Sequence, residues 1–283
     1  MNIAIVGKNS YIGTSFINYV SDLDGFNIIT IDAKNISVDQ MDFKGVDIVL
    51  HLAGIAHVSK KKSMKDLYYK INRDFAIETA LKAKNDGVKQ FIFMSSMIIY
   101  GEDARIGKSK VITEDTKPSP ANFYGQSKLD ADLGIQELES ETFKPVIIRC
   151  PMVYGPGCKG NFPRLVKLGL KLPVFPNIKN ERSMIYIDNL CESFKSIIIN
   201  NDSGVFYPQN EEYVSTVDII RVARELKNKK VRLTKIFNPL IRFLSMFINT
   251  FNKVFGNKVY GKTNRNIVMN QVDFKSSIIK SID

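Results

Sequence analysis

The chain has 283 residues, of which 44% are hydrophobic and 24% are charged, and this is the composition of an ordinary soluble globular protein. No run of about 18 apolar residues predicts a membrane-spanning helix, and no leader precedes the first predicted strand, so we expect a cytoplasmic protein. The three cysteines form no CxxC pair and only two histidines are present, so neither a disulfide framework nor a metal site is expected.

The net charge of +11 is concentrated near the C-terminus. Residues 227–283 contain twelve Lys or Arg and two acidic residues, so this segment carries nearly all of the excess. Such asymmetry predicts an anionic ligand, a partner or a membrane surface near this part of the chain. A nucleic-acid partner is not expected, because the segment lacks a recognised reading motif and an aromatic platform.

The first half of the chain alternates apolar, strand-like runs with amphipathic stretches. Strands are predicted over residues 2–7, 27–32, 46–54, 89–96 and 144–151, and helices over 11–23, over 66–87 and from about residue 123. Strands that are apolar throughout and separated by helices indicate a parallel sheet covered on both faces. The predicted fold class is therefore α/β, a Rossmann-type doubly wound parallel sheet.

The composition changes after Pro151, where Gly, Pro and Asn predict loops and short helices. A strand and a helix return over residues 184–199. We therefore expect two domains. Residues 1–157 plus 183–205 would bind a dinucleotide, and residues 158–182 plus 206–283 would form a smaller, mostly helical substrate-binding lobe.

The segment VGKNSYIG lies between the first predicted strand and its helix. Gly7 and Gly13 would let the backbone approach a pyrophosphate, and the helix N-terminus would supply N–H groups and a partial positive charge. Ser10 occupies the usual middle glycine position. The pattern favours a dinucleotide site formed with Tyr11 and Ile12 over a plain strand-to-helix turn, and hence NAD(H) or NADP(H).

Asp32 ends the second predicted strand. A carboxylate at this place would bind the adenosine ribose hydroxyls and repel a 2′-phosphate, which favours NAD; the alternative is a solvated loop acid. Leu52, Ala53 and Gly54 follow the third strand at the carboxyl edge of the sheet, where such ligands lie. We interpret the neighbouring His51 as structural.

Tyr124 and Lys128 lie four residues apart, which places both side chains on one face of a helix. A neighbouring ammonium and a positively charged nicotinamide would lower the pKa of the phenol, so that Tyr124 could exchange a proton with a substrate oxygen near neutral pH. Ser95 and Ser96 end the fourth strand, and a hydroxyl there could bind the same oxygen.

At this point the sequence resembles the extended short-chain dehydrogenase/reductases that act on nucleotide sugars. The matching residues run through most of the chain: Gly7–Gly13, Asp32, HLAG (51–54), Asn72, SSMIIYG (95–101), Tyr124 with Lys128, RCPMVYGPG (149–157), Asn161, Arg182 with MIYIDNL (184–190), and GVFYPQNEEYVST (204–216).

The resemblance implies that Ser96 is the catalytic hydroxyl, Tyr124 the acid/base and Lys128 its partner. It also implies that Asn161 and Arg182 contact the nucleotide diphosphate or its ribose, although Arg182 could instead form a surface salt bridge. Further positions are implied to line the cofactor (Asn72, Ser95, Tyr124, Lys128, Pro151, Val153) or the substrate (Ser96, Met97).

Two departures from the family pattern narrow the expected activity. Met97 and Ile98 replace the Asp-Glu pair of the family's dehydratases, so 4,6-dehydration is not expected. The stretch between Asp32 and Asp47 is too short for the extra strand and helix of many epimerases. We expect an NAD(P)H-dependent reductase of a nucleotide-linked 4-keto-6-deoxysugar, such as UDP-4-keto-6-deoxy-N-acetylglucosamine, in surface polysaccharide biosynthesis. A nucleotide-sugar C4 epimerase with tightly bound NAD and a non-catalytic dinucleotide sensor are the alternatives.

Residues 239–255 are unusually apolar, with one narrow polar stripe at helical spacing formed by Arg242, Ser245, Asn249 and Asn252. Two interpretations remain open. The segment could be a helix packed within the small lobe, or an interfacial helix that contacts the inner membrane surface. The family resemblance also implies a homodimer.

Overall fold

The apolar runs of the first half form the strands of one parallel sheet. The computed structural model describes residues 1–55, 62–262, 268–269 and 271–282. The six strands of the sheet follow one another in space in the order β10-β6-β4-β3-β1-β2, and every pairing is parallel. Their bounds are β1 Asn2–Val6, β2 Asn27–Ile31, β3 Ile48–His51, β4 Gln90–Ser96, β6 Lys144–Cys150 and β10 Gly204–Phe206.

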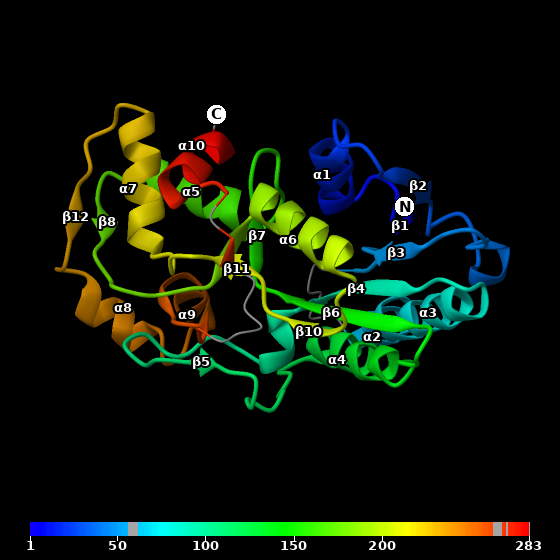
Figure 1. Ribbon diagram of the computed structural model, residues 1–283. Coiled ribbons are helices and arrows are strands. Elements are labelled where there is room, and N and C mark those ends of the chain that lie inside the picture. Colours follow the sequence, from blue (N-terminus) through cyan, green and yellow to red (C-terminus); the bar gives the residue numbers. More distant parts are fainter. Residues whose placement is uncertain (56–61, 263–267, 270, 283) are drawn as a thin grey trace. The chain divides into compact units, whose positions relative to one another are not determined.

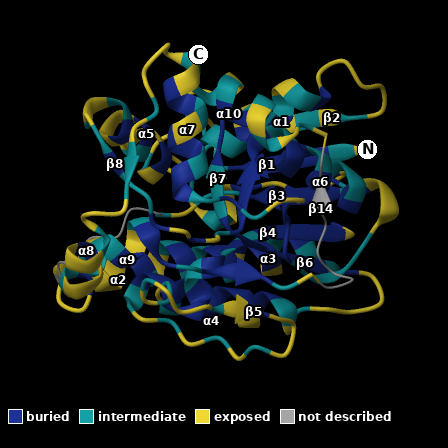
Figure 2. Cartoon of the chain, turned by 90° about the vertical axis from the view of Figure 1, so that its left-hand side faces the viewer, coloured by how far each residue is buried: buried dark blue, intermediate teal, exposed yellow. Residues whose placement is uncertain are grey.

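Helices cover both faces of this sheet, as Figure 1 shows. On one face lie α1 (Tyr11–Val20) and α6 (Ile187–Asn200), whose Phe16 and Phe194 rings meet edge to face at 5.7 Å. On the other lie α2 (Lys65–Tyr69), α3 (Phe75–Asn85) and α4 (Phe123–Gln136). The central strands β1, β3, β4 and β6 are largely buried between these layers, as Figure 2 shows, whereas β2 is mostly exposed and β10 is half-buried. The predicted Rossmann-type α/β fold is confirmed.

Short irregular elements connect these parts. The helix predicted over 66–87 consists of α2, a π-helical turn η3 (Lys70–Asp74) and α3. Other short turns are η1 (Val38–Gln40), η2 (Lys62–Met64) and η4 (Met97–Tyr100). Only η1 lies between β2 and β3, so the prediction that this stretch holds no extra strand and helix is confirmed, and β2 forms the edge of the sheet.

The chain divides into two compact units. Unit 1 contains the six-stranded sheet and comprises Met1–Gly101, Lys117–Cys150 and Leu190–Pro208. Unit 2 comprises Glu102–Thr116, Pro151–Asn189 and Gln209–Asp283. Residues 102–116, which the sequence assigned to the dinucleotide-binding part, therefore fold with unit 2.

Helices are the longest regular elements of unit 2, and short parallel strand pairs and irregular segments connect them. Its helices are α5 (Asn161–Lys171), α7 (Thr216–Leu226), α8 (Asn238–Leu244), α9 (Asn249–Phe255) and α10 (Phe274–Ile282). The strand pairs are β5 (Val111–Ile112) with β13 (Val259–Tyr260), β7 (Met152–Tyr154) with β9 (Met184–Tyr186), β8 (Phe175–Pro176) with β12 (Leu233–Thr234), and β11 (Gln209–Asn210) with β14 (Val268–Met269).

The single helix predicted over 239–255 is wrong. The segment forms two helices, α8 and α9. A turn separates them, in which the Ile248 N–H donates to the Leu244 carbonyl before α9 begins at Asn249. The expected polar stripe is also partly inverted, since Ser245 and Asn252 are buried. Within the described residues, no helix is long and apolar enough to cross a bilayer.

Candidate functional site

The turn after β1 has the backbone geometry of a cofactor cradle. Gly7 has φ +119°, and a Cβ built on it would lie 3.1 Å from the backbone nitrogen of Ala53. The N–H groups of Gly7 and Lys8 both donate to the Ile31 carbonyl at 3.0 Å. The turn is thus pressed against the ends of β2 and β3, where only glycine fits without strain.

Ser10 replaces the middle glycine and caps the helix that follows. Its Oγ accepts from the Gly13 N–H at 3.1 Å, and a Cβ on Gly13 would lie 2.7 Å from that oxygen. The helix α1 therefore begins at Tyr11, and its first turn, which includes Ile12, carries the positive end of the helix dipole. Such a turn and helix end together can hold an anionic group.

Asp32 directly follows β2 and is half-buried. Its carboxylate accepts from the Lys34 N–H at 3.0 Å and from Asn35 Nδ2 at 2.8 Å. These contacts are those of an Asx turn and leave acceptor capacity for a further donor. The carboxylate lies at the carboxyl end of the sheet, beside the switch point between β1 and β3 where ligands bind in open α/β folds.

Asn72 fastens the loop that carries Leu52, Ala53 and Gly54. Its Oδ1 accepts from the Ile55 N–H at 2.8 Å, and its Nδ2 donates to the Ile55 carbonyl at 3.1 Å. It lies in the π-helical turn η3, a distortion that is frequent at functional sites. This buried side chain therefore fixes the backbone of the loop.

Gly54 allows that loop to approach the helix α4. A Cβ at Gly54 would lie 3.0 Å from Asn72 Oδ1 and 3.3 Å from Lys128 Nζ. The loop that follows β3 and the Lys128 ammonium therefore lie close together, and a side chain at position 54 would crowd the ammonium.

His51 is buried among aromatic rings at the end of β3. Its ring lies 5.6 to 5.8 Å from those of Phe75, Phe91 and Phe93, and neither of its nitrogens has a hydrogen-bond partner among the described residues. Burial, reinforced by the charge of Lys128, lowers its pKa to about 3. The ring is therefore neutral and packs as a structural residue. The other histidine, His57, lies outside the described residues.

The first turn of α4 places Tyr124. Asn122 caps the helix by accepting from the Gly125 N–H at 2.9 Å, and Tyr124 is its second residue. A Cβ at Gly125 would lie 3.1 Å from the Ile98 carbonyl oxygen, so the helix packs closely on the turn that follows Ser96. The Tyr124 phenol is buried, and the Ser96 side chain is among the groups that influence its pKa.

The environment of Tyr124 differs from the sequence prediction. Burial raises its pKa to about 12, with a contribution from Tyr68, whereas hydrogen bonding to Ser96 opposes the shift. The lowering expected from Lys128 and a positively charged nicotinamide together stays a prediction, because in the protein alone desolvation of the phenolate dominates the pKa. Tyr124 is a protonated phenol at neutral pH.

Lys128 is held apart from solvent below the loop. Its Nζ donates to the Met94 carbonyl at 2.8 Å and lies 4.6 Å from the centre of the Phe93 ring. Burial lowers its pKa to about 8, and the charge of Asp132 opposes that shift. Lys128 therefore keeps a proton at neutral pH but binds it more weakly than a surface lysine.

A buried ion pair beneath this group was missed by the sequence analysis. Asp132 accepts from Arg149 Nη2 at 2.9 Å and Nε at 3.0 Å, and from the Ser95 hydroxyl at 2.8 Å. Arg149 also donates to the Tyr100 hydroxyl at 2.8 Å. The Ser95 hydroxyl is thus engaged by Asp132. Two features of the sequence could have indicated this pair. Arg149 is a charged residue inside the apolar strand 144–151, and Asp132 is an acid four residues after Lys128.

Four of the predicted residues belong to unit 2: Pro151, Val153, Asn161 and Arg182. Val153 lies in β7, and Pro151 directly precedes this strand. Asn161 is the first residue of α5 and follows Gly160, which has φ +101°. Met97, predicted to contact substrate, lies in unit 1 as the first residue of η4.

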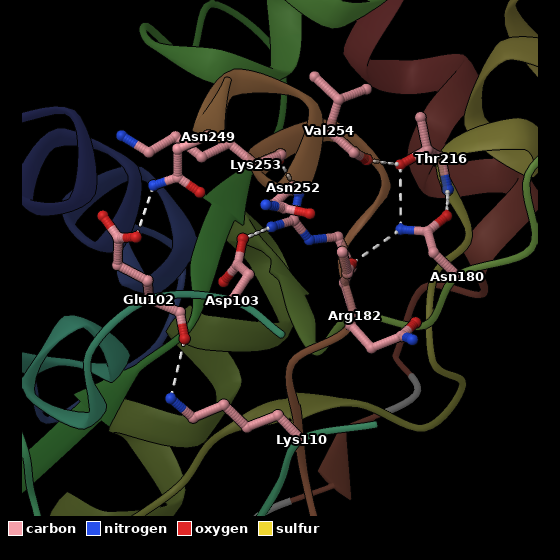
Figure 3. Close-up of polar contacts among 12 residues, drawn as sticks. Glu102, Asp103, Lys110, Asn180, Arg182, Thr216, Asn249, Asn252, Lys253 and Val254 are labelled. Atoms are coloured by element: carbon pink, nitrogen blue, oxygen red, sulfur yellow. Dashed lines mark hydrogen bonds and ion pairs between the residues drawn. The ribbon is translucent and has the colours of Figure 1, made fainter. Parts of the chain in front are cut away.

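Arg182 forms an ion pair, the alternative that the sequence had left open. As Figure 3 shows, its guanidinium binds the carboxylate of Asp103 and donates to the Lys253 carbonyl at 2.5 Å. The Asp103 carboxylate would therefore compete with a phosphate for the Arg182 guanidinium. The adjacent Asn180 and Glu181 line a cavity of about 520 Å³ in unit 2.

A family model identifies the relatives of this chain. The model described as "NAD dependent epimerase/dehydratase family" matches residues 3–209. A UDP-glucose 4-epimerase from Vibrio cholerae is 33% identical over 223 residues, which cover 76% of this chain and 67% of that protein. An Escherichia coli O157:H7 protein, N-acetyl-alpha-D-glucosaminyl-diphospho-ditrans,octacis-undecaprenol 4-epimerase, is 25% identical and covers 91% of this chain and 82% of its own length.

Solved structures share the fold. A UDP-glucuronic acid 4-epimerase from Bacillus cereus in complex with NAD has a TM-score of 0.78 at 19% identity, covering 100% of this chain and 96% of that one. A dTDP-4-dehydrorhamnose reductase from Clostridium acetobutylicum has a TM-score of 0.76 at 18% identity, covering 100% and 99%.

Proposed function

Because the chain belongs to the NAD dependent epimerase/dehydratase family, we propose that it catalyses NAD(P)(H)-dependent oxidation or reduction at C4 of a nucleotide-linked sugar. The observation that carries the proposal is one constellation in unit 1. The Tyr124 phenol lies by the Ser96 hydroxyl, and Lys128 on the same helix touches the loop that ends β3.

The cradle fits a dinucleotide. The Gly7–Gly13 turn leaves no room for a Cβ at either glycine, and the N-terminus of α1 lies directly behind it. The turn amides would hold the pyrophosphate, and Asp32 would accept from ribose hydroxyls, which favours NAD over NADP. When bound, the nicotinamide supplies the carbon that donates or accepts a hydride.

The chain's own groups would manage the proton. Tyr124 would give its phenolic proton to the C4 oxygen as a hydride reaches the carbon, or take it back in the reverse direction. Ser96 would donate a hydrogen bond to the same oxygen. Lys128 would stabilise the phenolate that forms, because its ammonium is fixed four residues along the helix.

We propose the reductase as the first form of this activity. In the protein alone Tyr124 is protonated, which prepares it to protonate the oxygen of a 4-keto sugar. The absence of an extra strand between β2 and β3 also agrees with the compact reductases that the sequence resembles. Met97 and Ile98 carry no titratable group, so these two positions supply no acid or base for removing water from the sugar.

A C4 epimerase is the second candidate. The relative from Vibrio cholerae, at 33% identity, is named a UDP-glucose 4-epimerase. The same Ser96, Tyr124 and Lys128 would serve both activities, because epimerisation is an oxidation followed by a reduction at one carbon. A non-catalytic dinucleotide sensor would require none of these three side chains to converge.

One experiment separates these functions. The purified protein is incubated with a UDP-4-keto-6-deoxysugar and NADH or NADPH, and absorbance of the reduced cofactor is followed together with the sugar product. Consumption equal to product identifies the reductase. Interconversion of UDP-glucose and UDP-galactose without added reductant identifies the epimerase. Cofactor binding with neither reaction would contradict the proposal and leave the sensor.

A further inference from the structure

Unit 2 exposes many large apolar side chains just before α8, along it and in the turn before α9. Of the sixteen large hydrophobic residues exposed among the described ones, seven fall between Ile236 and Ile248. Their exposed fractions range from 46% to 82%. We define them as the apolar surface: Ile236, Phe237, Leu240, Phe243, Met246, Phe247 and Ile248. Clusters of this kind mark interaction sites, whereas single exposed apolar residues need no explanation.

Hydrogen bonds to α9 fix the position of this helix within unit 2. Figure 3 shows Arg182 donating to the Lys253 carbonyl and Thr216 Oγ1 donating to the Val254 carbonyl, at 2.5 and 2.6 Å. Asn249 Nδ2 donates to Glu102 Oε2 at 2.5 Å. Each bond comes from a residue distant in sequence, so α9 is anchored at several points of unit 2.

The two helices are also joined to each other by buried polar contacts. Asn252 Nδ2 donates to the Ser245 carbonyl at 2.9 Å, and its Oδ1 accepts from the Ile106 N–H at 3.2 Å. On α8, Ile241 enters the core of the unit with Phe255 of α9. Turning α8 to bury Phe243 would break these contacts and leave buried polar groups unpaired, so the apolar surface remains outside.

The charge around the apolar surface selects its occupant. Residues 227–262 contain nine Lys or Arg and no Asp or Glu. Lys235, which precedes the apolar surface in sequence, and Arg242, which lies between its members, are both exposed. Figure 2 shows exposed ribbon along α8. Apolar side chains bordered by cations are the pattern of a protein that lies on an anionic bilayer.

A second copy of the chain is a poorer occupant. A two-fold interface would place each copy of this segment against itself, so the exposed Lys235 and Arg242 of one copy would lie near the same cations of the other. We propose that the apolar surface inserts into the interfacial region of an anionic lipid bilayer, with Lys235 and Arg242 binding lipid phosphates. This binding is peripheral, and it is independent of the proposed reaction.

Vesicle co-sedimentation of the full chain tests the proposal. One set of vesicles contains phosphatidylglycerol and phosphatidylcholine, and the other contains phosphatidylcholine alone. We expect binding to the anionic vesicles, weak binding to the neutral ones, and a decrease as NaCl rises from about 0.1 to about 0.5 M. Equal binding to both vesicle types, or to neither, would overturn the proposal.

Paired variants separate the two parts of the surface. Phe243→Ser with Phe247→Ser should weaken binding at least about 100-fold, because two aromatic side chains no longer leave water. Lys235→Gln with Arg242→Gln should weaken it about 30-fold. Ile199→Ser is the matched control, since Ile199 is 58% exposed on α6 and should leave binding unchanged.

Two results would contradict the insertion. In one, the phenylalanine pair binds anionic vesicles as tightly as the unchanged protein while circular dichroism shows that it is folded. In the other, light scattering finds an oligomer that the same pair converts into a monomer, which would assign the surface to a second copy. Both measurements need no substrate, so they leave the proposed reaction to be judged by its own assay.

Discussion

The buried pair of Asp132 and Arg149 permits a quantitative test of how unit 1 is stabilised. In Asp132→Asn the carboxylate charge disappears while the shape is kept. The guanidinium of Arg149 then remains buried without its counter-ion, and an amide cannot accept all of the bonds at 2.8 to 3.0 Å that the carboxylate accepts from Arg149 and Ser95. Breaking a buried pair from one side costs about 3 to 5 kcal/mol.

Urea unfolding followed by far-UV circular dichroism measures this cost. With a slope of about 3 kcal/mol per M for a chain of this size, the midpoint should fall by about 1 to 2 M. The matched control is Asp218→Asn, which breaks the pair of Asp218 with Arg221 at 2.7 Å, where both side chains are nearly half exposed. That control should lose about 0.5 kcal/mol.

A loss in Asp132→Asn that stays within about 1 kcal/mol of the Asp218→Asn control would refute this reasoning. It would mean that water or a shifted Arg149 compensates the charge. The slope must stay unchanged for the comparison to hold, because a change in slope reports an altered unfolded or intermediate state rather than a lost interaction.

Three further predictions concern the site. Tyr124→Phe should lower turnover about 10²- to 10⁴-fold in a steady-state assay while leaving the fold intact, and unchanged turnover would exclude Tyr124 as the acid. Gly7→Ala should weaken NAD binding at least about 10-fold in calorimetry, because its Cβ meets the Ala53 nitrogen at 3.1 Å; Gly45→Ala, where φ is +76° and the space is open, should bind normally. Burial lowers the pKa of Lys128 to about 8. Between about pH 8 and 10.5 the unfolded chain therefore holds a proton that the folded chain has released. The free energy of unfolding should rise with pH over this range by up to about 3 kcal/mol more than it does in Lys128→Met. Parallel pH profiles for those two proteins would contradict the burial of the ammonium.

Much of the fold could be predicted because it follows from local patterns. Each of the five apolar runs of the first half forms a strand of the sheet, and in four of them burial on both faces explains the apolar residues; the fifth, β2, is the exposed edge strand. The role of Gly7 and Gly13 in the turn after β1 could also be predicted, because a positive φ at Gly7 and close packing at Gly13 leave few other residues possible.

The remaining features depend on contacts between distant segments. Nothing local reveals that Asp103 pairs with Arg182, or that Asp132 pairs with Arg149. The raised pKa of Tyr124 in the protein alone was not foreseen, because residue spacing shows which charges are near but not how much water is removed from the phenol. The residues on the inner face of α9 were expected to face water because their burial depends on partners such as Ile106, far away in the sequence.

The division of unit 2 among three chain segments has a consequence during synthesis on the ribosome. All of unit 1 is available once Pro208 has emerged, but β5 pairs with β13, which lies roughly 150 residues further along. At about 5 to 20 residues per second, β5 must wait about 7 to 30 s for its partner. Because unit 1 is complete only after Pro208, about 50 residues before β13, residues 102–116 stay unpaired after unit 1 is complete for about the last 3 to 10 s of that wait, and a chaperone could cover them then.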